Sequence, residues 1–334
     1  MRYSSVAARD SVRICLLIAA LNGLDIMSTD IGNAYLNAKC KEKVHINKIG
    51  SELFGPECEG RSAIIVRALY GLASAGNSWR QTLRNTIIKE LGFFPCTADP
   101  DVYMKMKTKD DGTKYYSYLI VYVDDIICTD INPKATLSEL GEIYQLKGGI
   151  IFPDIYLGNN IRKWKYTNTE GIENVCYAMG SSSYIKEAVR VAENHQKCHD
   201  IKFPKSRKES SQTPFSHTDY RPELESSAEC NAELTQIYQN LIGILRWCCE
   251  LGRIDILLEV SLLSQYLVQL RIGHLEQVMN VFRYLKRHDR SWNVLDPTDY
   301  NIEWQPKNNE PSPWERANAM KELYHEAELK CQSH

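Results

Sequence analysis

Three aspartates are the residues of this sequence best suited to chemistry. Asp30 follows an apolar stretch, and Asp124 and Asp125 form an adjacent pair much further along the chain. Two-metal phosphoryl transfer needs carboxylates that are held together around two ions roughly 4 Å apart. Hard oxygen ligands of this kind suit Mg²⁺. If the segments that carry them are neighbours, the three aspartates form a platform for two Mg²⁺ ions, with Mn²⁺ as a possible substitute.

The apolar surroundings of the Asp124–Asp125 pair favour a metal site over a simple turn. Aspartates at strand ends usually serve turn chemistry, and each of the three, taken alone, fits that role or a helix cap. Here, however, apolar residues 121–123 precede the pair and residues 126–127 follow it. Unpaired charge at the edge of a core is costly, and a bound metal would offset that cost.

Alternating and helical patterns indicate the elements that must position these carboxylates. The periodicity predicts a buried helix over 11–21, stopped by Asn22-Gly23, and a second helix over 79–91, ended by Gly92. Strand-like stretches are expected at the following ranges: 25–31, 102–107 and 114–123. Asp110-Asp111-Gly112-Thr113 predicts a hairpin between the last two. Antiparallel hairpins mixed with helices indicate an α+β domain.

The C-terminal part of the chain has a different character. Residues 191–235 are rich in Lys, Ser, Glu and Pro, which predicts an irregular connector. Residues 236–288 carry three helical patterns that predict a small bundle, with Asp255 as the cap of its second helix. From residue 291 the chain is polar, and a short helix is expected over 313–330.

Composition narrows the class of protein. The 334 residues include 43% hydrophobic and 25% charged residues, which is typical of a folded protein. The longest apolar run, residues 14–21, is shorter than the roughly 20 residues of a membrane span. The N-terminal residues do not have the pattern of a secretory leader. The eleven cysteines do not have the spacing of zinc ligands. We therefore expect an intracellular protein without a membrane partner. The net charge of −2 is unusual for a nucleic-acid binder, although local patches matter more than the sum.

Ordered motifs make the sequence similar to a known family, the copia-type LTR retrotransposon reverse transcriptases. Residues 28–38 resemble the first catalytic motif of that family, and Tyr122-Val123-Asp124-Asp125 resembles the signature of reverse transcriptases at large. Further similar segments lie between and after these two, at the following positions: 68–72 with Trp79, 98–103, 156–158, 241–247, 253–256, 260–264 and 282–285. The resemblance runs from about Tyr3 to Pro297.

The resemblance implies a right-hand polymerase: an antiparallel palm sheet with helices, partial fingers and a C-terminal helical thumb. It divides the chain into a palm with truncated fingers (1–165), a connector (166–235), a thumb (236–290) and a polar tail without a ribonuclease H domain (291–334). The implied reaction is RNA-directed DNA synthesis on an RNA or DNA template with a primer. The implied partners are dNTPs and the other segments of a Pol polyprotein, integrase and ribonuclease H, in the cytoplasm or a virus-like particle.

The same resemblance implies roles for individual residues. Asp30, Asp124 and Asp125 would be the catalytic, metal-binding carboxylates. The dNTP would be bound by four residues: Ala34, Tyr35, Tyr70 and Gly71. Tyr35 would act as the steric gate that excludes a 2′-hydroxyl, although a half-buried strand aromatic would also explain it. The primer and template would contact seven residues: Tyr122, Tyr156, Leu157, Gly158, Arg283, Lys286 and Arg287. The last three would equally suit a helix C-terminus.

Departures from the family pattern predict a truncated element. The family carries basic fingers residues before Tyr3, usually a lysine at the position of Ala73 and often a proline at that of Gly76. Losing cations that bind a triphosphate weakens phosphoryl transfer. We therefore expect weak or no polymerase activity from the chain alone. The alternatives are a non-catalytic nucleic-acid-binding remnant and, at lower weight, a nucleotide cyclase with a similar palm.

Overall fold

The computed structural model of the chain describes residues 4–167, 171–198, 212–215 and 220–296. Within them, antiparallel sheets and helices build an α+β fold, as the sequence predicts. The short helix expected over 313–330 lies outside the described residues. None of the described helices is both long enough and apolar enough to cross a lipid bilayer.

A six-stranded antiparallel sheet carries the three aspartates. Its strands stand in the order β4-β5-β6-β7-β1-β8. Their bounds are β4 Phe94–Pro95, β5 Val102–Thr108, β6 Lys114–Tyr122, β7 Asp125–Asp130, β1 Asp25–Ile31 and β8 Leu146–Ile151. The predicted strands and the hairpin between β5 and β6 are confirmed. The strand order in the sheet also places β1 directly beside β7. The sequence did not decide whether these two strands are neighbours.

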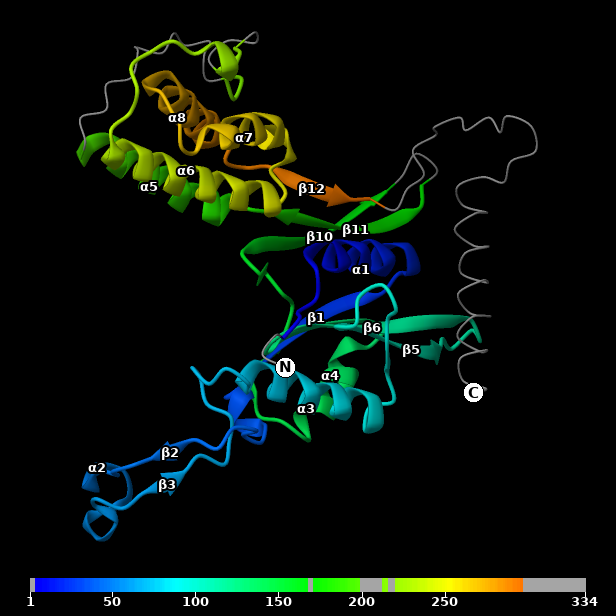
Figure 1. The fold of residues 1–334 in the computed structure, drawn as a ribbon. Helices are drawn as coiled ribbons and strands as arrows, with labels where there is room; N and C mark the ends of the chain where they lie inside the picture. Colours follow the sequence, from blue (N-terminus) through cyan, green and yellow to red (C-terminus); the bar gives the residue numbers. More distant parts are fainter. Residues whose placement is uncertain (1–3, 168–170, 199–211, 216–219, 297–334) are drawn as a thin grey trace. The chain divides into compact units, whose positions relative to one another are not determined.

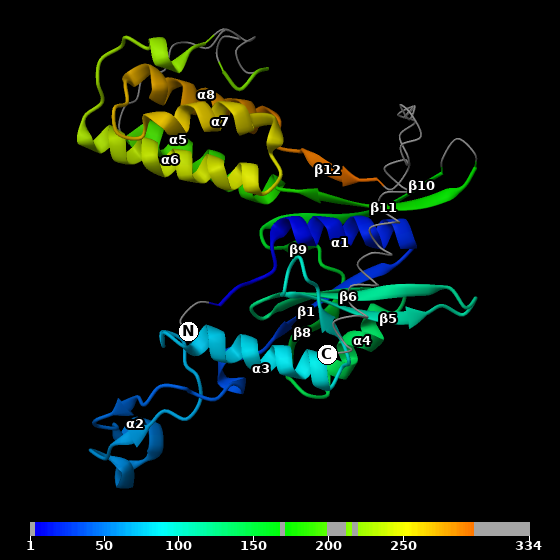
Figure 2. The ribbon, with the colours of Figure 1, turned by 45° about the vertical axis from the view of Figure 1, so that its right-hand side comes forward.

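Helices cover both faces of this sheet (Figures 1 and 2). Helix α1 (Arg9–Asn22) packs on one face, and helices α3 (Ala75–Lys89) and α4 (Pro133–Gly141) pack on the other. Successive side chains of β7 point to opposite faces of the sheet and so contribute to both hydrophobic cores. Ile126 packs with α3 and α4, whereas Ile127 packs with α1. The predicted stop of α1 is confirmed, since Gly23 is left-handed with φ 63°. Helix α3 starts earlier than the predicted residue 79, which places Trp79 in its second turn.

A two-stranded arm leaves the sheet between β1 and α3 (Figure 1). We use this name for residues 38–68, which contain β2 His45–Ile46, α2 Ser51–Phe54, η2 Pro56–Cys58 and β3 Ala63–Ile64. Backbone hydrogen bonds tie its two sides together, from Cys40 N–H to Val66 O at 3.0 Å and from Ala68 N–H to Ala38 O at 3.0 Å. The short helix η1 (Ala34–Asn37) joins β1 to the arm.

A second sheet lies partly within the range 166–235, which the resemblance assigns to a connector. Its strands are β9 Ile155–Tyr156, β10 Asn159–Thr167, β11 Glu173–Gly180 and β12 Trp292–Leu295, in the order β12-β11-β10-β9. Strand β11 and helix α5 (Ser182–Cys198) fall inside the range 166–235, and β12 falls inside the expected polar tail. Helix α5 forms because Ile185, Val189 and Ala192 share one buried face. The irregular structure predicted for 191–235 is therefore wrong for 191–198, which belong to α5, because the polar composition of the other helix faces hid this apolar stripe. Residues 199–211 and 216–219 of that range lie outside the described residues.

The C-terminal helices form a bundle around one core. It contains α5, α6 (Ala232–Glu250), α7 (Leu257–Leu263) and α8 (Ile272–Arg287), with short turns η4 Pro222–Leu224, η5 Ile254–Ile256 and η6 Ser264–Tyr266. The three predicted helices are confirmed. The prediction that Asp255 caps the second one is wrong, because its carboxylate pairs with the buried Arg253 at 2.7 and 2.9 Å. A buried guanidinium needs a counter-charge more than a short helix needs a cap.

Candidate active site

Strand pairing brings Asp30 and Asp125 together. Strands β1 and β7 are antiparallel, and Asp30 is the direct partner of Asp125 in their register. Direct partners on an antiparallel pair project from the same face with neighbouring side chains. The backbone N–H of Ile31 also donates to the carbonyl of Asp124 at 3.0 Å. Two segments far apart in sequence are thus fixed against each other at the end of β1.

A tight turn presents Asp124 beside this pair. We call residues 122–125 the carboxylate turn. Tyr122 pairs with Asp125, so Val123 and Asp124 alone connect β6 to β7. Val123 lies at φ 60°, a left-handed conformation that is rare for a β-branched residue. The predicted turn is therefore confirmed, and hairpin loops of two residues need such positive φ values.

Burial and neighbouring carboxylates raise the pKa of Asp125 and of Asp124. Burial, followed by the charges of Asp124 and Asp30, raises the pKa of Asp125 to about 6. Burial and the charge of Asp30 also raise the pKa of Asp124. Ionised carboxylates in such a setting repel each other, and a cation placed between them would relieve the repulsion.

The donor chemistry of these residues fits a divalent cation, although their arrangement is open. Carboxylate oxygens are the hard ligands that Mg²⁺ prefers. Nevertheless, within the part of the chain that the structure describes, no group of three or more His, Cys, Asp or Glu side chains is close enough to hold a metal ion. Asp30, Asp124 and Asp125 would therefore have to draw together around a bound ion.

Lys147 is a cation of this site that the sequence analysis missed. Strand β8 pairs with β1 on the side opposite β7, with Lys147 as the partner of Asp30. The Nζ of Lys147 lies 3.9 Å from Oδ2 of Asp30, and its side chain is 76% exposed. No local pattern marks this lysine, because only the register of β8 on β1 places it there.

Two tyrosines form an aromatic wall beside the carboxylates. The rings of Tyr35, on η1, and Tyr70 have centroids 4.4 Å apart with planes tilted by 34°. Burial, then the charges of Asp124, Tyr35 and Asp30, raise the pKa of Tyr70, which places its hydroxyl in the field of the site. Gly71 follows in a turn with φ 94°. Ala34 is fully buried and belongs to the core against which Tyr35 packs.

The residues predicted to contact the primer lie in three different settings: at the carboxylates, in a turn and in the core. Tyr122 ends β6 opposite Asp125, directly at the site. Leu157 and Gly158 form the turn between β9 and β10, with φ values of 49° and 84°. Tyr156 is only 4% exposed and packs in the core under α1, and burial raises the pKa of its hydroxyl. Its ring therefore supports the turn and does not form an outer surface.

The predicted basic cluster lies towards the C-terminal end of α8, and contacts within the bundle hold Arg283 and Lys286. Arg283 donates to Oδ1 of Asn280 at 2.7 Å, and Lys286 pairs with Glu193 of α5 at 2.6 Å. Arg287 is exposed at the last position of the helix.

Comparisons with known proteins agree with these features. The sequence profile of the family described as reverse transcriptase (RNA-dependent DNA polymerase) matches residues 2–169. The chain is 27% identical over 271 residues to the putative transposon Ty5-1 protein of Saccharomyces cerevisiae, covering 77% of this chain and 74% of that protein. No solved structure matches the chain.

Two plant relatives are much longer than this chain. The retrovirus-related Pol polyprotein from transposon RE1 of Arabidopsis thaliana is 28% identical over 152 residues, covering 43% of this chain and 10% of the polyprotein. The corresponding polyprotein from transposon TNT 1-94 of Nicotiana tabacum is 22% identical over 300 residues, covering 85% of this chain and 20% of the polyprotein. The chain belongs to the reverse transcriptase (RNA-dependent DNA polymerase) family, as a member of its copia-type LTR retrotransposon branch.

Proposed function

We propose that this chain catalyses RNA-directed DNA synthesis by two-metal transfer of a nucleotide from a dNTP to a primer 3′-hydroxyl. The observation that carries the proposal is the strand register that sets Asp30 opposite Asp125, with Asp124 in the adjoining turn. The raised pKa values of Asp124 and Asp125 support it, because they mark negative charge that protein groups leave uncompensated.

In this proposal each carboxylate has a role. Asp30 and Asp124 would hold both Mg²⁺ or Mn²⁺ ions, and Asp125 would help to hold one of them. When bound, such ions activate the attacking hydroxyl and neutralise charge on the triphosphate. Lys147, beside Asp30, is a positive group of the protein itself at this edge and would attract the triphosphate.

The aromatic wall would select the sugar of the incoming nucleotide. Tyr35, backed by Tyr70 at 4.4 Å, would pack under the ribose and leave no room for a 2′-hydroxyl, while Gly71 lets the backbone approach. The Tyr35→Ala variant should then incorporate rNTPs at least about tenfold more readily relative to dNTPs. Single-nucleotide incorporation kinetics with each substrate measure this ratio, and an unchanged ratio would remove Tyr35 from the role.

The remaining parts of the chain would guide the nucleic acid. The six-stranded sheet would form the palm and the arm the fingers, where the exposed Lys39, Lys41 and Lys43 alternate with half-buried residues. The bundle would form the thumb, and α5 belongs to it through the shared core. Lysine and arginine contacts to phosphates give binding that is independent of sequence and sensitive to salt. Tyr122, Leu157 and Gly158 would lie along the primer, and Arg283, Lys286 and Arg287 along the duplex.

Primer extension tests the proposal directly. The purified chain, an RNA template with a DNA primer, dNTPs and Mg²⁺ should give extension, even if slow. The Asp124→Asn variant should lose roughly a hundredfold or more of that rate, the scale on which one group that stabilises charge acts. Extension that does not depend on Asp124 would exclude this site. Robust Asp124-dependent extension would also remove the expectation that the chain alone is weak or inactive.

The competing function is nucleic-acid binding without catalysis. The open arrangement of the carboxylates favours it, because the described residues show no gathered set of metal ligands. A salt titration of primer–template binding, read beside the extension assay, separates the two functions. Salt-sensitive binding by a chain that extends no primer would favour the non-catalytic remnant. Partners from a Pol polyprotein, integrase and ribonuclease H, belong to the proposal in either case.

A further inference from the structure

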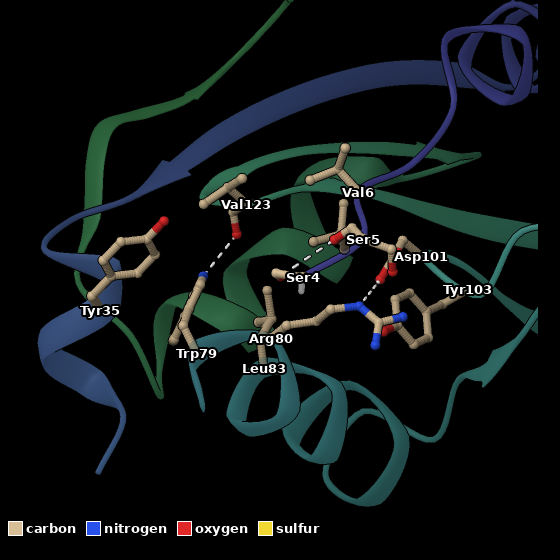
Figure 3. Close-up of a pocket in the computed structure, with 11 residues that line it drawn as sticks. Ser4, Ser5, Val6, Tyr35, Trp79, Arg80, Leu83, Asp101, Tyr103 and Val123 are labelled. Carbon is tan, nitrogen blue, oxygen red and sulfur yellow. Dashed lines mark hydrogen bonds and ion pairs between the residues drawn. The ribbon is translucent and has the colours of Figure 1, made fainter. Parts of the chain in front are cut away.

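A hydrogen bond from a buried tryptophan links helix α3 to the carboxylate turn. Trp79, in the second turn of α3, is only 1% exposed, and its indole Nε1–H donates to the backbone carbonyl of Val123 at 2.8 Å. Figure 3 shows the indole nitrogen of Trp79 facing that carbonyl. The acceptor is the residue immediately before Asp124, so the helix holds the turn at the point where it presents the aspartates.

The carbonyl that Trp79 holds belongs to the strained residue of the turn. Val123 is β-branched and lies at φ 60°, a conformation that persists only where surrounding contacts impose it. Asparagine or glycine would adopt this φ more easily. The turn therefore needs external contacts to keep Val123 and Asp124 in place. The backbone N–H of Ile31 supplies one at the carbonyl of Asp124, and the indole of Trp79 supplies another at the carbonyl of Val123.

Val123 packs against the core that contains Trp79, but this packing is incomplete. A cavity of about 170 Å³ is lined by residues of α3, the N-terminal segment and β6, and both Trp79 and Val123 line it (Figure 3). Trp79 itself is fixed, because it packs edge-on against Tyr144 at 5.4 Å and 81°. The Tyr144 hydroxyl in turn shares a hydrogen bond of 2.7 Å with Thr86 of α3.

We infer that Trp79 is a positioning residue that holds the strained Val123 and thereby sets where Asp124 and Asp125 stand. Its effect on catalysis rests on the proposed polymerase function. Its effect on the turn does not, because it follows from the hydrogen bond and the backbone conformation alone. Misplacing a catalytic group by about 1 Å can cost roughly a hundredfold in rate, so a loosened turn would reduce turnover without unfolding the protein.

The first test compares two variants that each lose one buried hydrogen bond in the same core. Trp79→Phe removes the bond to Val123 and keeps an aromatic ring. Tyr144→Phe removes the bond to Thr86 and leaves the turn untouched. Hydrogen exchange of the full chain, read by mass spectrometry over peptides covering 120–127, should be about fivefold to tenfold faster in Trp79→Phe. Exchange over these peptides should be unchanged in Tyr144→Phe.

Exchange that is unchanged in Trp79→Phe, or raised equally in both variants, would overturn the inference. Hydrogen exchange can be measured without an active enzyme, so it tests the role of Trp79 even if the chain extends no primer. Failure of extension in the unmodified chain would count against the proposed function only. Where extension is measurable, kcat of Trp79→Phe should fall roughly tenfold to a hundredfold. KM for dNTP should change by less than about twofold.

A second variant tests whether strain is the reason for the contact. Glycine adopts φ 60° without cost, so a turn with Val123→Gly should depend less on Trp79. The loss caused by Trp79→Phe should therefore be several times smaller in the Val123→Gly background than in the unmodified chain. Fully additive losses in exchange and in kcat would show that Trp79 does not act through the conformation of Val123.

Discussion

The two aspartates at the ends of strand β7 have opposite electrostatic surroundings. Asp125 begins the strand opposite Asp30, and Asp130 ends it opposite Asp25. Asp130 is 1% exposed and accepts hydrogen bonds from four side chains: Tyr115 at 2.7 Å, Ser117 at 2.6 Å, Thr136 at 2.8 Å and Lys107 at 2.6 Å. Asp125 faces the charges of Asp30 and Asp124 instead.

The pKa values of the two residues diverge accordingly. Burial alone would raise the pKa of Asp130, but its hydrogen bonds from Lys107, Ser117, Tyr115 and Thr136 together lower it to about 2. Burial and two neighbouring carboxylates raise the pKa of Asp125 to about 6. One strand therefore carries one carboxylate that side-chain donors neutralise and one that stands beside other carboxylates. A buried aspartate indicates a binding site only when its donors are missing.

The largest effect on stability is expected for a substitution of Asp130, whose charge is neutralised by its side-chain donors. Asp130→Asn should lower the free energy of unfolding at pH 7 by about 3–5 kcal/mol, because it leaves Lys107 without its counter-charge inside the sheet. Urea or guanidinium denaturation followed by circular dichroism measures this loss. Asp125→Asn, at the other end of the same strand, is the matched control and should not destabilise the chain.

The pH dependence of this loss identifies its cause. A folded-state pKa below the ordinary value means that ionised Asp130 stabilises the folded protein fully above about pH 4. That contribution is lost as the pH falls towards about 2. The gap between the unmodified chain and Asp130→Asn should therefore narrow over the same interval. A gap that stays constant down to pH 2 would mean that packing, and not charge, holds this end of β7.

A smaller change in stability, of opposite sign, is expected for a substitution of Asp125, which lies beside two other carboxylates. The folded-state pKa of Asp125 lies above its ordinary value, so folding favours the protonated form. The corresponding stability is complete below about pH 4 and is lost as the pH rises through about 6. Without metal, Asp125→Asn should therefore be more stable than the unmodified chain at pH 8, by roughly 1–2 kcal/mol after allowance for solvent screening.

Thermal unfolding in EDTA at pH 8 and at pH 4.5 measures this difference. The variant should melt a few degrees higher at pH 8, and most of that advantage should disappear at pH 4.5. A variant that is less stable than the unmodified chain at pH 8 would show that Asp125 is neutralised within the protein after all. The contrast between the two ends of β7 would then fail.

Much of the fold follows from local sequence patterns. The strands over 102–107 and 114–123, the turn at Gly112 and the helix stop at Gly23 were all predicted, because each depends on neighbours in the chain. The failures have a common cause. Helix α5 was hidden in a polar composition, and Asp255 serves Arg253 instead of a helix end. In both cases a partner remote in sequence, or a packed face, outweighed the local signal.

Local residue types and motifs were enough to single out the candidate carboxylates. The motifs of the sequence identified Asp30, Asp124 and Asp125 and predicted the turn that carries the last two, because residue type and turn chemistry are local properties. Only the tertiary structure decided that Asp30 stands opposite Asp125 and that Lys147 lies beside them. It also placed the Trp79 indole against Val123. Strand register and helix docking depend on the packing of distant segments, and no single segment specifies them.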